Sequence, residues 1–211
     1  ETLQDSAIVR AMRKQLVKKT LDLLGELAEH NTEKYQSFWE HFGVVLKEGI
    51  HLSPEHKERL ASLCRFASSH ADEGLTSLSD YVARMHDGQE AIYYVVGANR
   101  AALEDSPHLE ALKAKDHEIL FMTDPIDEWV VGALTEFEGK TFISAMKAGL
   151  EVKRDDSDTE DAAESTEAIA GLIGRFEAVL SQEVESVVVS ERLTDSPACL
   201  VIPEGGMHAH V

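Results

Sequence analysis

The sequence has few cysteines and no long apolar run, and both features narrow the class of protein. Its 211 residues include two cysteines, Cys64 and Cys199, which lie far apart and lack the spacing of a metal site. Buried free thiols in a reducing compartment are therefore favoured over a disulfide. No apolar run approaches the ~20 residues that a membrane helix requires, and the chain does not open with a signal-peptide pattern. We therefore expect a cytoplasmic protein with no membrane partner.

Basic residues are also scarce relative to acidic ones. Lys and Arg number 20 against 39 Asp and Glu, which gives a formal net charge of −19. Binding a nucleic-acid backbone requires clustered positive charge, so we do not expect a nucleic-acid partner. Solubility is the simplest explanation of the acidity. Apolar residues make up 43% of the chain and charged residues 28%, which is the composition of a globular protein with one or two domains.

The short motifs of common enzyme classes are absent from the sequence. No GxGxxG follows a predicted strand, no Walker A sequence occurs, and no serine lies in a nucleophile elbow. Ten histidines are present, but His208 and His210 form the only close pair, and no cysteine or third ligand lies beside them. We therefore expect this chain to hold neither a metal nor a cofactor.

The first part of the chain, residues 1–74, is predicted to be helical. Apolar residues keep a helical period over 5–29, and an aromatic stripe marks a second helix over 32–47. A Ser-Pro pair starts a third helix over 53–67. The first helix carries five bases that either bind an anion or, more simply, face solvent: Arg10, Arg13, Lys14, Lys18 and Lys19.

Residues 75–150 alternate strand and helix patterns and are predicted to form an α/β subdomain. Short apolar runs predict strands at 91–96, 117–122 and 141–145. Helical patterns occur at 79–85, 98–104, 107–115 and 125–134. A strand–helix–strand–helix–strand order is typical of parallel βαβ units, in which ligands bind at the carboxyl ends of the strands. The fold class is therefore α/β within this subdomain and α+β overall.

The stretch 151–167 is predicted to be an acidic linker. After Arg154 it holds seven acids, no base and almost nothing apolar, so it cannot bury enough surface to fold alone. Beyond it we expect one helix and two strands, at 168–180, 184–190 and 198–202. This last part, 168–211, is small for an independent core, which predicts a truncated α+β domain.

One stretch combines a strand, a helix start and an uncommon set of side chains. Ile119–Met122 is typical of a strand covered on both faces, and Thr123-Asp124-Pro125 predicts an N-cap followed by proline in the first turn. Asp127, Glu128 and Trp129 then begin the helix on sides that face away from the sheet. The candidate site is therefore an aromatic side chain beside two carboxylates.

These side chains allow more than one interpretation. Asp127 and Glu128 could be the acid–base pair of an independent α/β enzyme, although carboxylates at a helix start also complement the helix dipole. Trp129 either packs against the neighbouring helical part or stays exposed as an anchor for a partner.

Several short segments match the sequences of a known family, and they occur in the same order along nearly the whole chain. They are Leu3–Ser6, Glu33–Tyr35, Leu63–Phe66, Asp80–Met85, Ile92–Tyr94, Ser106–Pro107, Thr123–Trp129 and Glu136–Lys140. In these segments the chain closely resembles the heat-shock protein 90 chaperones, in particular the bacterial form. The resemblance implies a fragment that comprises the end of the middle domain, an acidic linker and a C-terminal domain without its final dimerisation helices.

The resemblance also implies roles for particular residues. Glu128 and Trp129 match family residues that bind partly folded client proteins, and Gly132 stands where a bacterial relative has a polar residue implicated in the same contact. Gln4 matches a residue that supports a catalytic arginine on the γ-phosphate side of ATP.

For the parent protein, the resemblance implies a homodimeric chaperone with an ATPase outside this chain. ATP and Mg would be bound by the absent N-terminal domain, so the fragment itself is not expected to be an enzyme. The implied partners are non-native clients, a second copy of the parent and an Hsp70-type cochaperone system.

Overall fold

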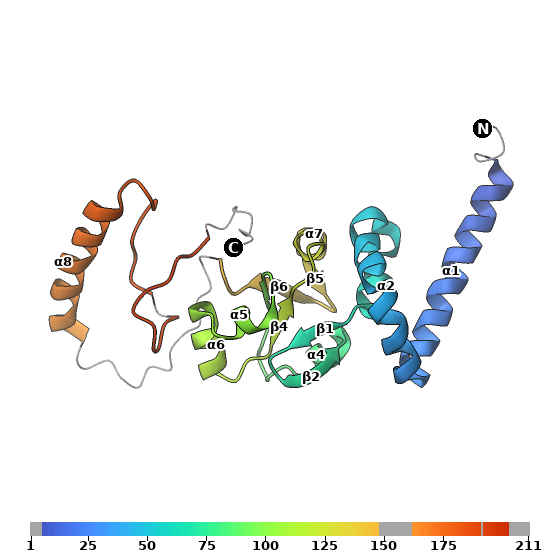
Figure 1. Cartoon of the computed structure of the whole chain (residues 1–211), viewed down its shortest axis with the longest axis horizontal. Coiled ribbons are helices and arrows are strands. Elements are labelled where there is room, and N and C mark those ends of the chain that lie inside the picture. The colour runs from blue at the N-terminus through green and yellow to red at the C-terminus, as the bar shows by residue number, and fades with distance from the viewer. Residues whose placement is uncertain (1–5, 148–161, 191, 203–211) are drawn as a thin grey trace.

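The structure is a computed structural model and describes residues 6–147, 162–190 and 192–202. The first part of the chain is helical and lies at one end of the molecule (Figure 1). Its elements are α1 (Ala7–His30), α2 (Thr32–Leu52), the 3₁₀ helix η1 (Pro54–His56) and α3 (Lys57–Leu63). The three predicted helices are thus confirmed, although the third ends before residue 67.

A single residue, Asn31, both ends α1 and begins α2. Its backbone N–H donates to the carbonyl of Leu27, and its side chain accepts a hydrogen bond from the N–H of Lys34 at 3.1 Å. Asparagine suits this position because its side-chain oxygen can satisfy an N–H in the first turn of a helix. The chain therefore turns back within one residue, and α2 packs against α1, α3 and α7, with Tyr35 and Trp39 buried.

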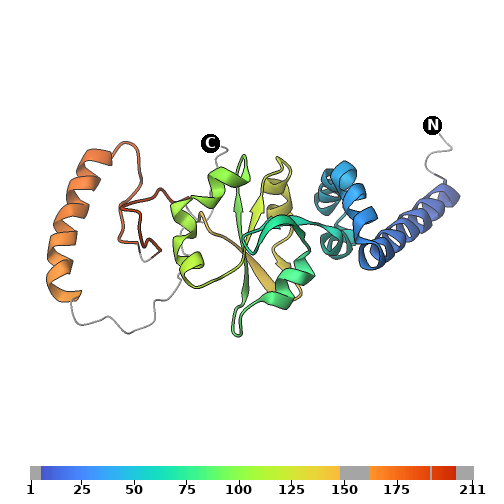
Figure 2. The same ribbon diagram turned by 60° about the horizontal axis from the view of Figure 1, so that its bottom comes forward.

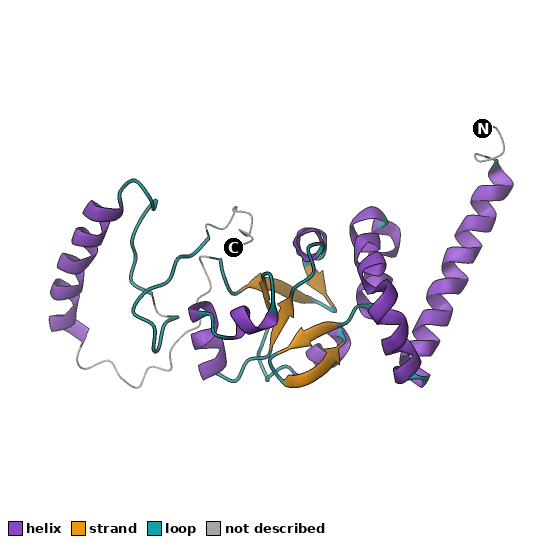
Figure 3. Ribbon diagram, viewed as in Figure 1, coloured by secondary structure: helices purple, strands orange, loops and turns teal. Residues whose placement is uncertain are grey.

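The centre of the molecule is a six-stranded mixed sheet in the order β2-β1-β4-β3-β6-β5 (Figure 3). Its strands are β1 (Phe66–Ser68), β2 (Ala71–Thr76), β3 (Ala91–Val96), β4 (Ile119–Met122), β5 (Glu136–Phe137) and β6 (Lys140–Ser144). β3 pairs in parallel with β4 on one side and with β6 on the other. The predicted parallel three-stranded core is therefore confirmed.

Helices and a 3₁₀ helix connect the strands and cover both faces of the sheet. They are α4 (Leu78–Arg84), α5 (Arg100–Glu104), η2 (Pro107–Leu109), α6 (Glu110–Ala114) and α7 (Asp127–Ala133). Successive side chains of a strand point to opposite faces. Accordingly, Tyr94 of β3 packs in a core with α4, α7 and the helical part, whereas Val95 packs in a second core with α5 and α6.

Three antiparallel strands extend the sheet beyond the predicted core: β5 beside β6 at one edge, and β1 and β2 beside β4 at the other. The range 53–67 was expected to be helical to its end, but Ala67 pairs with Phe121 of β4 and Ser68 with Leu120. β2 then pairs with β1 as a hairpin. The helix prediction at 66–67 was wrong because pairing with β4, distant in sequence, overrides local helix preference. The sheet consequently begins at Phe66, within the range 1–74 expected to be helical.

The C-terminal part departs most from the sequence expectations. α8 (Ala162–Leu180) begins at Ala162, so the last residues of the expected linker are helical; residues 148–161 lie outside the described chain. Neither 184–190 nor 198–202 forms a strand, apart from one parallel bridge between Ile202 and Lys147. The strand predictions were wrong because a strand requires a hydrogen-bonded neighbour, and the described residues provide only that bridge. Figure 2 shows α8 at the end opposite to α1.

Arg192 joins the C-terminal segment to the end of the sheet. Its guanidinium is buried and donates to the carbonyl of Ala145 at 3.1 Å and to that of Lys147 at 2.8 Å. Its own carbonyl accepts from the N–H of Ala111 on α6 at 3.1 Å. The segment around Arg192 is therefore fixed both to α6 and to the chain leaving β6.

Glu110, the first residue of α6, makes the second connection to this segment. Its carboxylate accepts from the N–H groups of Thr194 at 2.6 Å and Asp195 at 2.9 Å, and from both the N–H and the hydroxyl of Ser196. We call Glu110, Arg192 and residues 194–196 the C-terminal latch.

Candidate functional site

The candidate site lies on α7, which follows directly after the buried strand β4. Between them Asp124 and Asp127 form a tight turn: the N–H of Asp127 donates to the carbonyl of Asp124 at 2.9 Å, and the N–H of Asp124 donates to Oδ2 of Asp127 at 3.0 Å. The turn delays the helix to Asp127, two positions after Pro125. Val130 and Leu134 are buried in the core, and they fix the face that α7 turns toward the sheet.

Lys47 of α2 fixes the first turn of α7 to the helical part. Only 3% of Lys47 is exposed, and its Nζ lies 2.7 Å from Oδ2 of Asp124 and 2.8 Å from Oδ1 of Asp127. The ammonium also lies 4.8 Å from the centre of the Phe66 ring. Burial opposes the charged form of Lys47, but the carboxylates of Asp127 and Asp124 outweigh it and raise the pKa of Lys47 above its ordinary value. Burial also raises the pKa of Asp127, although the ammonium of Lys47 opposes this shift. Lys47 Nζ is thus held between the carboxyl groups of Asp124 and Asp127.

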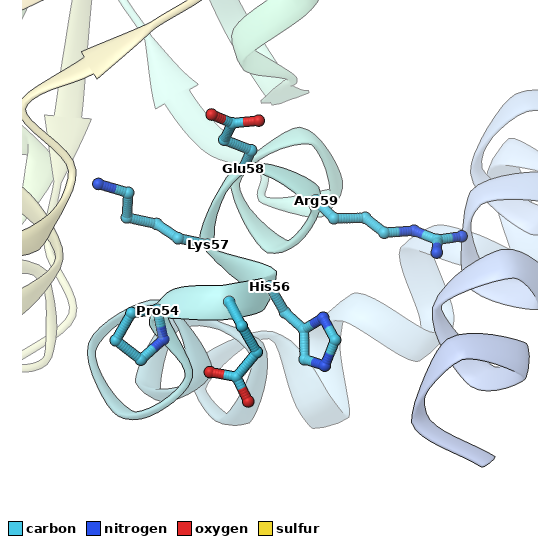
Figure 4. Close-up of a pocket in the computed structure, with 6 residues that line it drawn as sticks. Pro54, His56, Lys57, Glu58 and Arg59 are labelled. Atoms are coloured by element: carbon cyan, nitrogen blue, oxygen red, sulfur yellow. The ribbon is translucent and has the colours of Figure 1, made fainter. Parts of the chain in front are cut away.

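The position of Asp127 corrects the expectation that both carboxylates face away from the core. Its side chain is fully buried, with 0% exposed, and is directed to Lys47 rather than to solvent. Substrate cannot reach a carboxylate in this setting, so the geometry does not support the acid–base pair Asp127 and Glu128. A shallow hollow at Pro54–Arg59 does not include either carboxylate, and the side chains labelled in Figure 4 point in different directions instead of converging.

Trp129 is exposed, so of the two interpretations of this side chain, packing against the helical part does not hold. It is 60% exposed, in contrast to Trp39 at 8%. Its indole contacts the imidazole of His51 on α2, with ring centroids 5.3 Å apart and planes at 58°. The helical part therefore flanks the indole on one side and leaves most of it accessible.

Glu128 is the neighbour of Trp129 in the first turn of α7. It is half-buried, and Tyr94 of β3 is close enough to respond to its charge. Burial first, and the Glu128 carboxylate second, raise the pKa of Tyr94 to about 12.

Gly132, one turn after Glu128 on α7, is exposed, and a Cβ added there would meet no atom within 4 Å. A longer side chain at this position would thus project into solvent beside the site. Gln4 lies outside the described residues.

Two residues that shape the site, Lys47 and His51, were missed by the sequence reasoning. For Lys47 a signal was available, because it follows Tyr35, Trp39 and Gly43 at intervals of four on the buried face of α2. A lysine in such a row is expected to be buried and paired. For His51 no sequence signal identifies the partner, because Trp129 comes from a distant part of the chain.

Among the described residues, no group of three or more His, Cys, Asp or Glu side chains is placed to hold a metal ion. Within the same residues, no helix is long and apolar enough to cross a membrane.

Comparison with known proteins identifies the family. The family described as Hsp90 protein matches residues 1–211. Chaperone protein HtpG of Myxococcus xanthus is 51% identical over 211 residues, which cover 100% of this chain and 32% of that protein. The HtpG proteins of Bordetella avium and Escherichia coli are 42% and 46% identical, over 100% and 94% of this chain and 34% and 32% of their own length. The chain thus spans about a third of the curated relatives it matches, and it belongs to the Hsp90 family.

Proposed function

We propose that the chain is part of an ATP-dependent molecular chaperone and that it binds partly folded client proteins on α7, through Trp129 and Glu128. The observation that carries this proposal is the indole of Trp129, which is 60% exposed on a helix whose other side is fixed in the core. A rigid, accessible aromatic side chain is a common anchor for binding. Covering the exposed part, roughly 150 Å², would contribute about 3–4 kcal/mol as an upper bound.

Charge at the site favours one kind of client. The half-buried carboxylate of Glu128 lies next to Trp129, and the whole chain carries a formal net charge of −19. Complementary charge speeds association and discriminates between partners. Client segments that combine apolar side chains with Lys or Arg therefore fit the site best.

The proposal is tested by titrating the chain with reduced and alkylated lysozyme, a basic protein that stays unfolded. We expect Trp129→Ala to weaken binding about tenfold or more, which corresponds to ~1.4 kcal/mol, and Glu128→Gln to weaken it less. Leu23→Ala on α1 is the control, because Leu23 is 62% exposed and lies on another helix; its affinity should equal that of the wild type. Equal affinities of wild type and Trp129→Ala would remove the proposed site.

For the parent protein we infer a homodimeric, cytoplasmic ATPase chaperone of which this chain forms the end of the middle domain and part of the C-terminal domain. The domain ranges 1–74, 75–150, 151–167 and 168–211 belong to this proposal. ATP and Mg would be held by an N-terminal domain outside the chain, with Gln4 on the γ-phosphate side, and the fragment alone would not be an enzyme. An Hsp70-type cochaperone system is the further partner we propose.

We also propose that the chain couples the N-terminal ATPase of the parent to its C-terminal dimerisation domain, and a specific observation favours this second role. The C-terminal latch attaches residues 192–196 to α6 and to the end of β6 through buried Arg192 and through Glu110. Such contacts transmit a rotation of one part to the other, whereas a free linker would absorb it.

A further inference from the structure

The C-terminal end of α2 lies directly beside α7 (Figure 1). Lys47 and His51 are one turn apart on α2 and contact successive parts of α7: Lys47 binds Asp127, and His51 flanks Trp129. Residues four apart lie on one face of a helix. One face of α2 therefore holds the start of α7 in place and also borders its exposed indole.

An exposed apolar side chain follows at once on α2. Leu52, the last residue of the helix, is 72% exposed, more than Trp129 at 60%. His51 is exposed as well. The rings of Trp129 and His51 contact each other, and Leu52 follows His51 at the end of α2. We call these three residues, drawn from two helices, the α2–α7 platform. An exposed aromatic or apolar side chain can anchor a binding partner.

Carboxylates lie within four residues of Leu52 along the chain, while Lys47 and Lys57 are already engaged. Glu48, one turn before Leu52, and Glu55 in η1 are both exposed. Lys47 is paired with Asp124 and Asp127, and Lys57 donates to the carbonyl of Ala133 at 3.3 Å. The border is therefore acidic.

We propose that the α2–α7 platform is the complete client site and that His51 and Leu52 share with Trp129 the binding of one extended client segment, in which an apolar side chain is flanked by Lys or Arg. The proposal rests on the proposed function of Trp129 and adds the second helix to it. The shared indole–imidazole contact makes the two helices continuous at this point. The acidic border selects basic flanking residues and disfavours acidic ones.

The platform suits an extended segment better than a folded domain or a small molecule. It combines the ends of two helices, whereas small-molecule sites are concave and enclose the ligand. The nearby hollow at Pro54–Arg59 is lined mostly by charged side chains, and those labelled in Figure 4 diverge. An unfolded segment needs only a few apolar anchors and complementary charge on such a surface.

Three variants test the platform: His51→Ala, Leu52→Ser and His51→Phe. The matched control is Leu16→Ser on α1, because Leu16 is 65% exposed and undergoes the same change as Leu52. With reduced and alkylated lysozyme, we expect His51→Ala and Leu52→Ser each to weaken binding about three- to tenfold. His51→Phe should retain wild-type affinity because it keeps a ring against the indole, and Leu16→Ser should have no effect.

A pair of synthetic peptides tests the charge preference. Both contain the same Leu-Phe centre, flanked by Lys in one and by Glu in the other. We expect the Lys-flanked peptide to bind at least tenfold more tightly, and we expect Trp129→Ala combined with Leu52→Ser to weaken it by less than the product of the single effects, because both residues contact one segment.

The outcomes separate the platform from the proposed function. If Trp129→Ala weakens binding but His51→Ala and Leu52→Ser do not, the platform is overturned and the site on α7 stands. If Leu16→Ser weakens binding as much as Leu52→Ser, or the two peptides bind equally, the platform is likewise overturned. If Trp129→Ala has no effect, the proposed function itself fails. Far-UV circular dichroism establishes that each variant is folded before it is titrated.

Discussion

The buried ammonium of Lys47 determines how its neighbours must be arranged. Burying an unpaired charge costs several kcal/mol, so Lys47 is retained in the core only with its two carboxylates in place. Asp124 and Asp127 meet it from the turn that starts α7. Because this turn also sets the direction of α7, a residue without access to solvent fixes the orientation of the exposed Trp129.

Glu110 provides a prediction at the scale of one titrating group. The hydroxyl of Ser196 and the N–H groups of Asp195 and Thr194 stabilise its carboxylate and lower the pKa of Glu110 from 4.5 to about 2. Because the pKa of Glu110 is lower in the folded state than in the unfolded state, its carboxylate contributes fully to folding stability above pH ~4.5. This contribution to stability is lost as the pH falls toward ~2. NMR titration of the Glu110 carboxyl carbon should therefore give a midpoint near 2.

The control for this titration is Ser196→Ala, which removes the largest of the stabilising contacts. The midpoint of Glu110 should rise in this variant. A wild-type midpoint at the ordinary glutamate value of 4.5 would show that the latch does not form in solution.

At the scale of single elements, local sequence pattern was sufficient to predict those strands that are marked by a continuous apolar run of their own. The strand at 91–96 is found as predicted, and the strands near 119 and 141 are found within two residues of their expected bounds, because continuous apolar runs mark buried strands. β1 could not be predicted, since only its pairing with β4 makes it a strand. The expected strands beyond Val184 show the converse case, in which apolar residues without a pairing partner remain irregular.

Two glycines in helices test how tightly α2 is packed. A Cβ on Gly43 of α2 would lie 2.7 Å from Cε2 of Trp39, whereas a Cβ on Gly25 of α1 would meet no atom within 4 Å. Alanine is favoured over glycine in a helix by up to ~1 kcal/mol, so Gly25→Ala should stabilise the chain. Gly43→Ala gains the same preference but overpacks the core and should destabilise it by about 1–3 kcal/mol net.

Urea unfolding followed by circular dichroism measures both changes in the free energy of unfolding. Because the helix preference is common to the two substitutions, the difference between them reports the packing around Trp39. Stabilisation of equal size in both variants would contradict the tight contact between α2 and its own indole.

At the scale of the whole molecule, the site depends on contacts that no single stretch of sequence contains. The stretch 119–140 was identified from its strand, helix and aromatic pattern, and Trp129 is exposed there as the binding hypothesis requires. The burial of Asp127 was not predicted, because its partner Lys47 comes from α2. The same separation hides the contact between His51 and Trp129. Sequence patterns thus locate the site, and the packing of α2 against α7 gives it its shape.

The most direct test of client binding at the junction of α2 and α7 is a map of the bound surface. The ¹⁵N-labelled chain is titrated with reduced and alkylated lysozyme, and amide chemical shifts are followed by NMR. We predict that the perturbed amides cluster on α7 around Glu128 and Trp129 and on the last turn of α2 around His51 and Leu52. Perturbations confined to α1 or α8, with α7 unchanged, would contradict the proposed function.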